Sequence, residues 1–232
     1  MKIGIIGAIN QEIKILKKMI YPYTKKIIGN CEIYISIFKK NNVFLIKSGI
    51  GKVSSSIACM ILIHLYKIDI IINSGSAGSL IPSLRVGDII IPKKICYHDV
   101  NLTNFGYSFG QIPKHPKFFV IKKEIYIFLK NITQTFQLKF KTGLIVSGDS
   151  FINGHLAIKK LKEEFSSAIA VDMESAAIAQ VCYQFSIPFI FIKTISDLSD
   201  VNATLNFKKN IKIASFRSSQ IVKIILENTM KI

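Results

Sequence analysis

The alternation of hydrophobic runs with amphipathic stretches predicts the first elements of the chain. The Ile-rich run Lys2–Gly7 predicts a buried strand, and Gln11–Met19 then has apolar residues at helical spacing. Cys31–Phe38 and Asn42–Ser48 are strand-like runs separated by only three polar residues, which predicts an adjacent antiparallel pair. The amino-terminal part should therefore contain three strands and one helix.

From about residue 43 onward, predicted strands alternate with predicted helices. Further strands are expected over 69–73, 88–92, 141–147, 168–172 and 189–195, and helices over 53–66, 122–136, 156–165, 175–185 and 207–228. The small-residue segment 74–79 is expected to turn, and 196–200 to form a loop. This order predicts a three-layer α/β/α fold with a mixed, mainly parallel twisted sheet. For 232 residues we expect one domain, residues 1–232.

One long segment, Cys96–Phe119, has no clear hydrophobic period. It combines asparagine, glycine, aromatic residues and proline. A loop of this length inside a globular chain usually carries function or covers an interface. We therefore expect this segment to take part in binding or assembly.

The net charge of +17 raises the question of a polyanionic partner. The lysines are dispersed as pairs along the chain and do not gather into one basic arm interleaved with aromatic residues. Abundant Ile, Lys and Asn instead indicate an AT-rich coding sequence. We therefore expect no nucleic-acid partner, although a salt-sensitive nucleic-acid-binding protein is the non-enzymatic alternative.

The remaining composition points to a cytoplasmic protein without a metal. The four cysteines, at positions 31, 59, 96 and 182, form no CxxC pair, so neither a zinc nor a redox motif is expected. The amino-terminal apolar run is too short for a signal peptide. No stretch reaches the roughly 20 apolar residues of a membrane span, so no membrane partner is expected.

Three carboxylates fall where predicted strands end, which is where open α/β sheets bind ligands. Asp197 follows a strongly apolar strand, and partial burial there would raise its pKa, as suits a general acid. Glu12 and Glu174 also follow strands. Taken singly, each has a structural alternative: a cap for Asp197, a helix-start carboxylate for Glu12 and a solvated side chain for Glu174.

Two turns supply further groups for a ligand. The small residues 75–78 allow close approach to the backbone, although they match neither a Walker A nor a dinucleotide motif. Phe151 could stack on a flat base or anchor the core. The three carboxylates with these turns provide what glycosidic cleavage needs: an acid for the leaving group, a base for water and hydrogen bonds to the sugar.

These segments resemble the 5′-methylthioadenosine/S-adenosylhomocysteine nucleosidases, which have the purine nucleoside phosphorylase-like fold. The resemblance covers essentially the full length. It is carried by IGIIGA at the start, KSGIGKV (47–53), INSGSAG (72–78), VGDIIIP (86–92), YHDV (97–100), FGYSFGQIP (105–113), GLIVSGDSFI (143–152), AVDMESAAIA (170–179) and TISDLSD (194–200).

The resemblance implies hydrolysis of adenine thionucleosides without a cofactor or a metal. Asp197 is expected to protonate adenine N7, Glu12 to orient the attacking water and Glu174 to bind the ribose hydroxyls. Phe151 would stack on adenine and Ile152 would read its edge. The other expected contacts are Ser76, Gly78 and Ser196 near sugar and base, and Ile9, Ile50, Met173 and Phe207 around the 5′-thio group.

The resemblance also implies a homodimer. The irregular segment would reach into the partner subunit's site through Leu102, Phe105, Tyr107 and Pro113. Two departures from the family pattern concern the substrate pocket. Lys193 stands where Arg is common and lacks its planar fork, so the orientation of Glu12 or of nearby water is in question. Ile9 stands where Met is common, which changes the shape of the 5′ pocket modestly.

Two further alternatives stay open from the sequence. A purine nucleoside phosphorylase would use the same acid but needs a cationic phosphate pocket, whereas Ile50 follows Ser48–Gly49 and the chain has only two arginines, Arg85 and Arg217. A nucleoside-binding or storage protein could also use this fold. The complete set of three carboxylates argues against lost chemistry.

Overall fold

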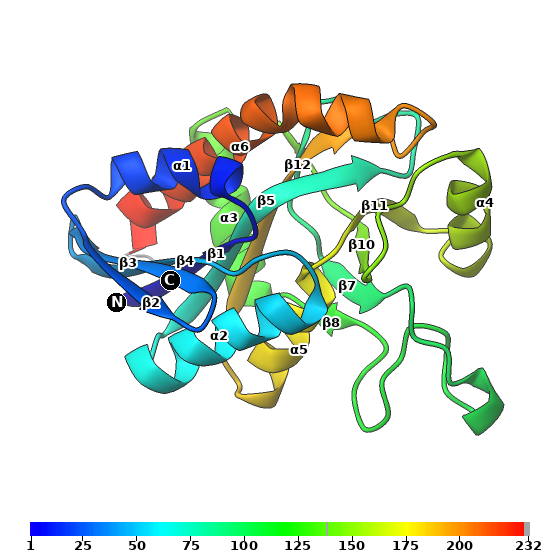
Figure 1. The fold of residues 1–232 in the computed structure, drawn as a ribbon, viewed down its shortest axis with the longest axis horizontal. Helices are drawn as coiled ribbons and strands as arrows, with labels where there is room; N and C mark the ends of the chain where they lie inside the picture. The colour runs from blue at the N-terminus through cyan, green and yellow to red at the C-terminus, as the bar shows by residue number, and fades with distance from the viewer. Residues whose placement is uncertain (138, 230–232) are drawn as a thin grey trace.

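A single mixed sheet lies between two layers of helices (Figure 1). The computed structural model describes residues 1–137 and 139–229. Helices α1 (Asn10–Met19) and α6 (Ala203–Asn228) cover one face of the sheet, and α2 (Lys52–Tyr66) and α5 (Ser175–Gln184) cover the other. Helices α3 (Lys123–Thr135) and α4 (His155–Glu164) lie at the periphery. The predicted three-layer arrangement is confirmed.

The sheet branches at its longest strand, β5. Its main path runs β2-β3-β4-β1-β5-β11-β10-β7-β8, and β12 pairs with β5 on a second path that continues to β6 and β9. Strand β5 is parallel to β1 and β12 but antiparallel to β11. The strands are β1 (Lys2–Gly7), β2 (Thr24–Ile28), β3 (Cys31–Phe38), β4 (Asn41–Lys47), β5 (Ile70–Ser79), β6 (Ile89–Ile90), β7 (Lys94–Tyr97), β8 (Phe119–Val120), β9 (Phe140–Lys141), β10 (Leu144–Ser147), β11 (Ala168–Asp172) and β12 (Phe189–Asp197).

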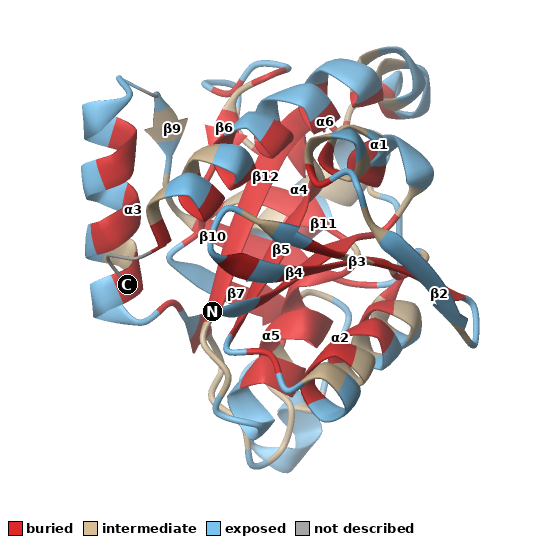
Figure 2. Cartoon of the chain, turned by 90° about the vertical axis from the view of Figure 1, so that its left-hand side faces the viewer, coloured by how far each residue is buried: buried red, intermediate tan, exposed pale blue. Residues whose placement is uncertain are grey.

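The central strands are apolar on both faces because helices cover both. Every residue of β12 is buried, and Ile190, Phe191 and Ile192 have no exposed surface. Figure 2 shows this buried centre between helices whose outer faces are exposed. Such near-continuous apolar runs are typical of parallel strands with helices on both sides.

Two predicted boundaries next to the site are wrong. Residues 74–79 form no turn, because β5 continues to Ser79 and pairs with β12 as far as Gly78. Strand β12 likewise continues through Asp197, so this residue ends a strand and does not lie in a loop. Pairing along both edges of β5 outweighs the low strand propensity of its glycines and serines.

Other boundaries differ at the edges of the fold. Helix α6 begins at Ala203, four residues before the predicted start. The exposed strand β2 was not predicted, and 88–92 contributes only β6. The run 141–147 is divided between β9 and β10, and the segment 96–119 is mostly irregular apart from strand ends and a 3-10 turn, η1 (Thr103–Phe105). Within the described ranges, no helix is long and apolar enough to cross a membrane.

Candidate active site

A cavity of about 480 Å³ lies where β1, β11 and β12 end, beside the second half of β5. Its volume is in the range of small-molecule sites. The twelve site residues expected within one subunit all line it: Ile9, Glu12, Ile50, Ser76, Gly78, Phe151, Ile152, Met173, Glu174, Ser196, Asp197 and Phe207. Residues that are separated by up to about 200 positions in sequence therefore meet at one place.

The four residues expected to serve a partner's site do not line this cavity. Leu102, Phe105, Tyr107 and Pro113 lie on the irregular segment, and Phe105 is 77% exposed. Within one chain these side chains therefore complete no site.

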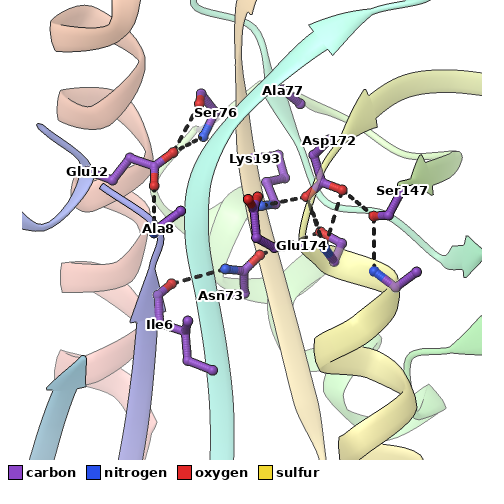
Figure 3. Close-up of polar contacts among 12 residues, drawn as sticks. Ile6, Ala8, Glu12, Asn73, Ser76, Ala77, Ser147, Asp172, Glu174 and Lys193 are labelled. Atoms are coloured by element: carbon purple, nitrogen blue, oxygen red, sulfur yellow. Dashed lines mark hydrogen bonds and ion pairs between the residues drawn. The ribbon is translucent and has the colours of Figure 1, made fainter. Parts of the chain in front are cut away.

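Glu12 is held by four donors at the start of α1. One carboxylate oxygen accepts the N–H groups of Ala8 at 2.8 Å and Ile9 at 3.3 Å. The other accepts the N–H of Ser76 at 2.9 Å and its hydroxyl at 3.0 Å, as Figure 3 shows. The side chain thus both caps its own helix and joins α1 to β5, so the structural alternative and the site role coexist.

Gly75 leaves the space that the Glu12 carboxylate occupies. A Cβ on Gly75 would lie 2.7 Å from Glu12 Oε1 and 3.1 Å from its carboxyl carbon. With the role in orienting water that the family resemblance implies for Glu12, Gly75→Ala should displace the carboxylate and lower kcat about 10-fold or more, because misplacement of a reacting group by about 1 Å can cost about 100-fold. Release of adenine, the product that the resemblance implies, compared with the far-UV circular dichroism of the same variant, tests this expectation; unchanged kcat would contradict it.

Asp197 ends β12 immediately after a bulge. The register with β5 shifts between Ile195 and Asp197, and Asp197 lies opposite Gly78. Such bulges re-aim side chains at the ends of strands. A Cβ on Gly78 would lie 2.4 Å from the Ser199 hydroxyl oxygen and 3.0 Å from Asp197 Oδ1, so glycine leaves the space that these two side chains occupy.

The environment of Asp197 favours its protonated form. The residue is only 2% exposed, and burial raises the pKa of its carboxyl group, although the Ser196 hydroxyl at 2.8 Å and the Ser199 N–H at 3.0 Å oppose this shift. The hydrogen bond from Ser199 is a local turn contact of the kind that a cap makes. A buried acid at the wall of a cavity can deliver a proton to a ligand.

Glu174 is buried at the start of α5, which rules out the structural alternative of a solvated side chain. Its Oε1 accepts the Gly51 N–H at 2.9 Å. Burial and the negative charge of Asp172 raise the pKa of Glu174 to about 8, although Lys193 acts in the opposite direction. Glu174 lines the cavity, and its carboxyl oxygens can accept further hydrogen bonds from hydroxyls.

This raised pKa predicts how stability depends on pH. Between about pH 4.5 and 8, Glu174 binds a proton in the folded chain but is ionised in the unfolded chain. The free energy of unfolding should therefore fall as pH rises through this range. We expect Glu174→Gln to remove this contribution, so that thermal melting from pH 5 to 9 shows the wild type losing stability relative to the variant. The exposed Glu164→Gln should melt in parallel with the wild type at every pH; a Glu174→Gln curve that also stays parallel would contradict the prediction.

Lys193 and Asp172 form a buried ion pair behind Glu174. The two charged groups are 2.7 Å apart, and both side chains are 2% exposed. Asp172 also accepts hydrogen bonds from Ser147 (Figure 3) and from Ser175. Burial acts to lower the pKa of Lys193, but the surrounding carboxylates raise it. The direct partner of Lys193 is therefore Asp172, whereas other donors orient Glu12.

The first turn of α2 joins three segments around the cavity. The Lys52 N–H donates to Asp149 at 2.7 Å, next to the Gly51 N–H that binds Glu174. The Lys52 ammonium lies 2.6 Å from Asp99, which also accepts the Asp149 N–H at 3.0 Å. Gly51 has a φ of 93°, and a Cβ there would lie 2.8 Å from Asp149 Oδ1. The loop that carries Phe151 is thereby fixed to α2.

The cavity wall includes residues that sequence reasoning did not assign to the site. They are Ala8, Ala77, Ser150, Val171, Asp172, Ser199, Thr204 and Lys208. Thr204 and Lys208 share a face with Phe207 near the start of α6, a spacing that could have indicated them had the helix start been predicted correctly. Among residues 1–137 and 139–229, no group of three or more His, Cys, Asp or Glu side chains is arranged to hold a metal ion.

Comparison with known proteins identifies the family. The model of the phosphorylase superfamily matches residues 2–227. A 5′-methylthioadenosine/S-adenosylhomocysteine nucleosidase from Buchnera aphidicola subsp. Acyrthosiphon pisum (strain Tuc7) is 64% identical over 98% of both chains. The S-adenosylhomocysteine nucleosidase of Streptococcus pyogenes, solved with 5-methylthiotubericidin, superposes with a TM-score of 0.94 at 36% identity, covering 98% of this chain and 97% of its own.

A second solved structure has the same fold with a different ligand. The 5′-methylthioadenosine/S-adenosylhomocysteine nucleosidase of Colwellia psychrerythraea 34H, in complex with adenine, has a TM-score of 0.93 at 36% identity and covers 98% of this chain and 95% of its own. Sequence and fold agree over nearly the whole length. The chain belongs to the phosphorylase superfamily and, within it, to the 5′-methylthioadenosine/S-adenosylhomocysteine nucleosidase family.

Proposed function

We propose that this chain hydrolyses the N-glycosidic bond of 5′-methylthioadenosine and S-adenosylhomocysteine, and also of 5′-deoxyadenosine. The products are adenine and the corresponding thioribose or deoxyribose sugar, which places the reaction in methionine salvage and in recycling of S-adenosylmethionine by-products. The observation that carries the proposal is the meeting of Glu12, Glu174 and Asp197 in one cavity with Phe151. Two solved relatives that superpose on this chain support it: one binds adenine (TM-score 0.93), and the other binds 5-methylthiotubericidin (TM-score 0.94).

In the proposed reaction, Asp197 donates its proton to adenine N7. The N-glycosidic bond then breaks with its electron pair on the base, which leaves as neutral adenine, and an oxocarbenium-like sugar remains. Water adds at C1′ and passes a proton to the Glu12 carboxylate, which balances the proton that Asp197 gave to the base. The buried position of Asp197 supports this role, because burial raises the pKa of its carboxyl group and so favours the form that can donate a proton.

We assign the orientation of the attacking water to Glu12. Of the four donors to this carboxylate, the Ser76 hydroxyl alone can rotate away, since the other three are backbone N–H groups. A bound water can take its place beside Glu12 Oε1 without disturbing the helix cap. Ser76 is then free to bind the same water or a sugar hydroxyl.

The other wall residues suit the parts of the nucleoside. Phe151 is half-exposed and packs edge-on against Phe207, with ring centroids 6.1 Å apart, which leaves a face for the base to stack on. We assign Glu174 to the ribose hydroxyls, Ile152, Gly78 and Ser196 to the base and its surroundings, and Ile9, Ile50, Met173 and Phe207 to the 5′-thio group.

Phosphorolysis is the rival reaction, and the charges of the cavity favour hydrolysis. A phosphate ion needs a cationic pocket next to C1′. Within the described residues, the one cation on the cavity wall is Lys208, and the segment 48–51 supplies none. The deciding experiment measures adenine release from 5′-methylthioadenosine, S-adenosylhomocysteine and 5′-deoxyadenosine, with and without inorganic phosphate. Release that is independent of phosphate supports hydrolysis, whereas strict dependence on phosphate refutes it.

We also propose that the chain works as a cytoplasmic homodimer. The exposed Phe105, together with the exposed Val53 and Ile57 on α2, supports an apolar contact with a second copy, and Leu102, Tyr107 and Pro113 would then approach the partner's cavity. Sedimentation of the intact chain at micromolar concentration should give the mass of a dimer. A monomeric mass together with full activity would refute this part. The free state of all four cysteines suits a reducing compartment.

A further inference from the structure

Lys208 lies on the wall of the substrate cavity although it is an exposed lysine. It lies one helical turn after Thr204 and directly after Phe207, near the start of α6, and all three residues line the cavity. Residues three and four positions apart share one face of a helix. Because Lys208 is exposed, its ammonium can remain hydrated at the mouth while its aliphatic stem follows the wall.

The other ionisable side chains on the wall are all acidic. Glu12, Asp172, Glu174 and Asp197 all line the cavity. The nearest buried cation, Lys193, is paired with Asp172 and is itself absent from the wall. Among the described lining residues, Lys208 is therefore the one cation that a ligand carboxylate could pair with.

We propose that Lys208 binds the carboxylate of the amino-acid tail of S-adenosylhomocysteine and thereby sets the preference between this substrate and 5′-methylthioadenosine. The inference rests on the proposed function and concerns the specificity of the same site. The adjacent Phe207 belongs with Ile9 and Ile50 to the apolar walls assigned to the 5′-thio group. A tail on the 5′-sulfur would extend past these side chains towards solvent, where Lys208 is exposed. A methyl group at that position has no charge for Lys208 to recognise.

The expected contribution is modest because the ammonium is accessible to water. A single exposed ion pair changes an equilibrium by up to about fivefold, and salt screens it. The effect should appear in the ratio of kcat/KM for S-adenosylhomocysteine to kcat/KM for 5′-methylthioadenosine. This ratio cancels changes that affect the nucleoside as a whole.

The test compares Lys208→Gln with Lys209→Gln. Lys209 is a matched control because it is the next residue on the same helix, is exposed and does not line the cavity. We expect Lys208→Gln to lower the ratio about three- to fivefold at low salt and less in 0.5 M NaCl, and Lys209→Gln to leave it unchanged. With the carboxamide analogue of S-adenosylhomocysteine as substrate, Lys208→Gln should behave as the wild type does.

The possible outcomes separate this inference from the proposed function. An unchanged ratio in Lys208→Gln, an equal fall in Lys209→Gln, or an undiminished effect with the carboxamide would overturn the role of Lys208 while the nucleosidase activity stands. Inorganic phosphate, added at constant ionic strength, gives a further test. If it lowers the kcat/KM ratio of the wild type but not that of Lys208→Gln, phosphate competes with the substrate carboxylate at Lys208, which supports the proposal. Absence of adenine release from both substrates by the wild type would instead remove the proposed function itself.

Discussion

Replacement of Asp197 by Asn is expected to lower kcat for adenine release by about 10²–10⁴-fold, which is the usual contribution of a general acid. The amide has nearly the same shape as the carboxyl group but has no acidic proton to give to N7. Its oxygen can still accept the Ser199 N–H that Asp197 accepts at 3.0 Å. The variant should therefore fold, and its binding of adenine, measured by calorimetry, should change far less than kcat.

A neighbouring carboxylate gives the matched control for this prediction. Asp200 lies three residues further on, is partly exposed and accepts the N–H of Asn202 at 2.9 Å. Asp200→Asn makes the same change of side chain three residues beyond the end of β12 but removes no proton donor from the cavity wall. We expect it to keep kcat within a few-fold of the wild type. Near-full activity of Asp197→Asn would show that another group protonates the base.

The fold was largely predictable because its core follows hydrophobic periodicity. The runs that form β1, β3, β4 and β12 are apolar enough to identify strands without any tertiary information. The wrong boundaries next to the site have a common cause: the residues concerned adopt a structure that depends on the strands beside them in the sheet. Gly75 and Gly78 are poor strand formers, yet they belong to β5 because β12 pairs with them. Glycine stands at both positions because side chains of the site occupy the space that a Cβ would fill.

Site residues that lie at the ends of predicted strands could be predicted from the sequence. Contacts between residues that are far apart in the sequence could not. Carboxylates at strand ends are visible in the sequence, and Glu12, Glu174 and Asp197 all line the cavity. The pairing of Lys193 with Asp172 was not visible, since it joins β12 to β11, which are not neighbours in the sheet. No local pattern separates Lys208 from the other dispersed lysines either. Its position became apparent only with the start of α6.

Glu12→Gln should damage both activity and stability, which distinguishes it from Asp197→Asn. The three backbone N–H groups that surround Glu12 need acceptors, and a carboxylate supplies them on both oxygens. The amide NH₂ of Gln would face either the N–H groups of Ala8 and Ile9 or the N–H of Ser76. At least one buried donor then loses its acceptor, at a cost of about 1–3 kcal/mol.

We therefore expect Glu12→Gln to lower the free energy of unfolding by about 1–3 kcal/mol and kcat by about 10²–10⁴-fold. Urea unfolding and adenine release measure the two effects separately. Glu124→Gln is the matched control, because Glu124 is also an acidic residue in the first turn of a helix but lies outside the cavity. If Glu12→Gln lost stability but kept kcat, Glu12 would serve only as the link between α1 and β5, and the water would have to be oriented by another group. If Glu12 both caps α1 and orients the attacking water, Glu12→Gln should lower kcat and stability together.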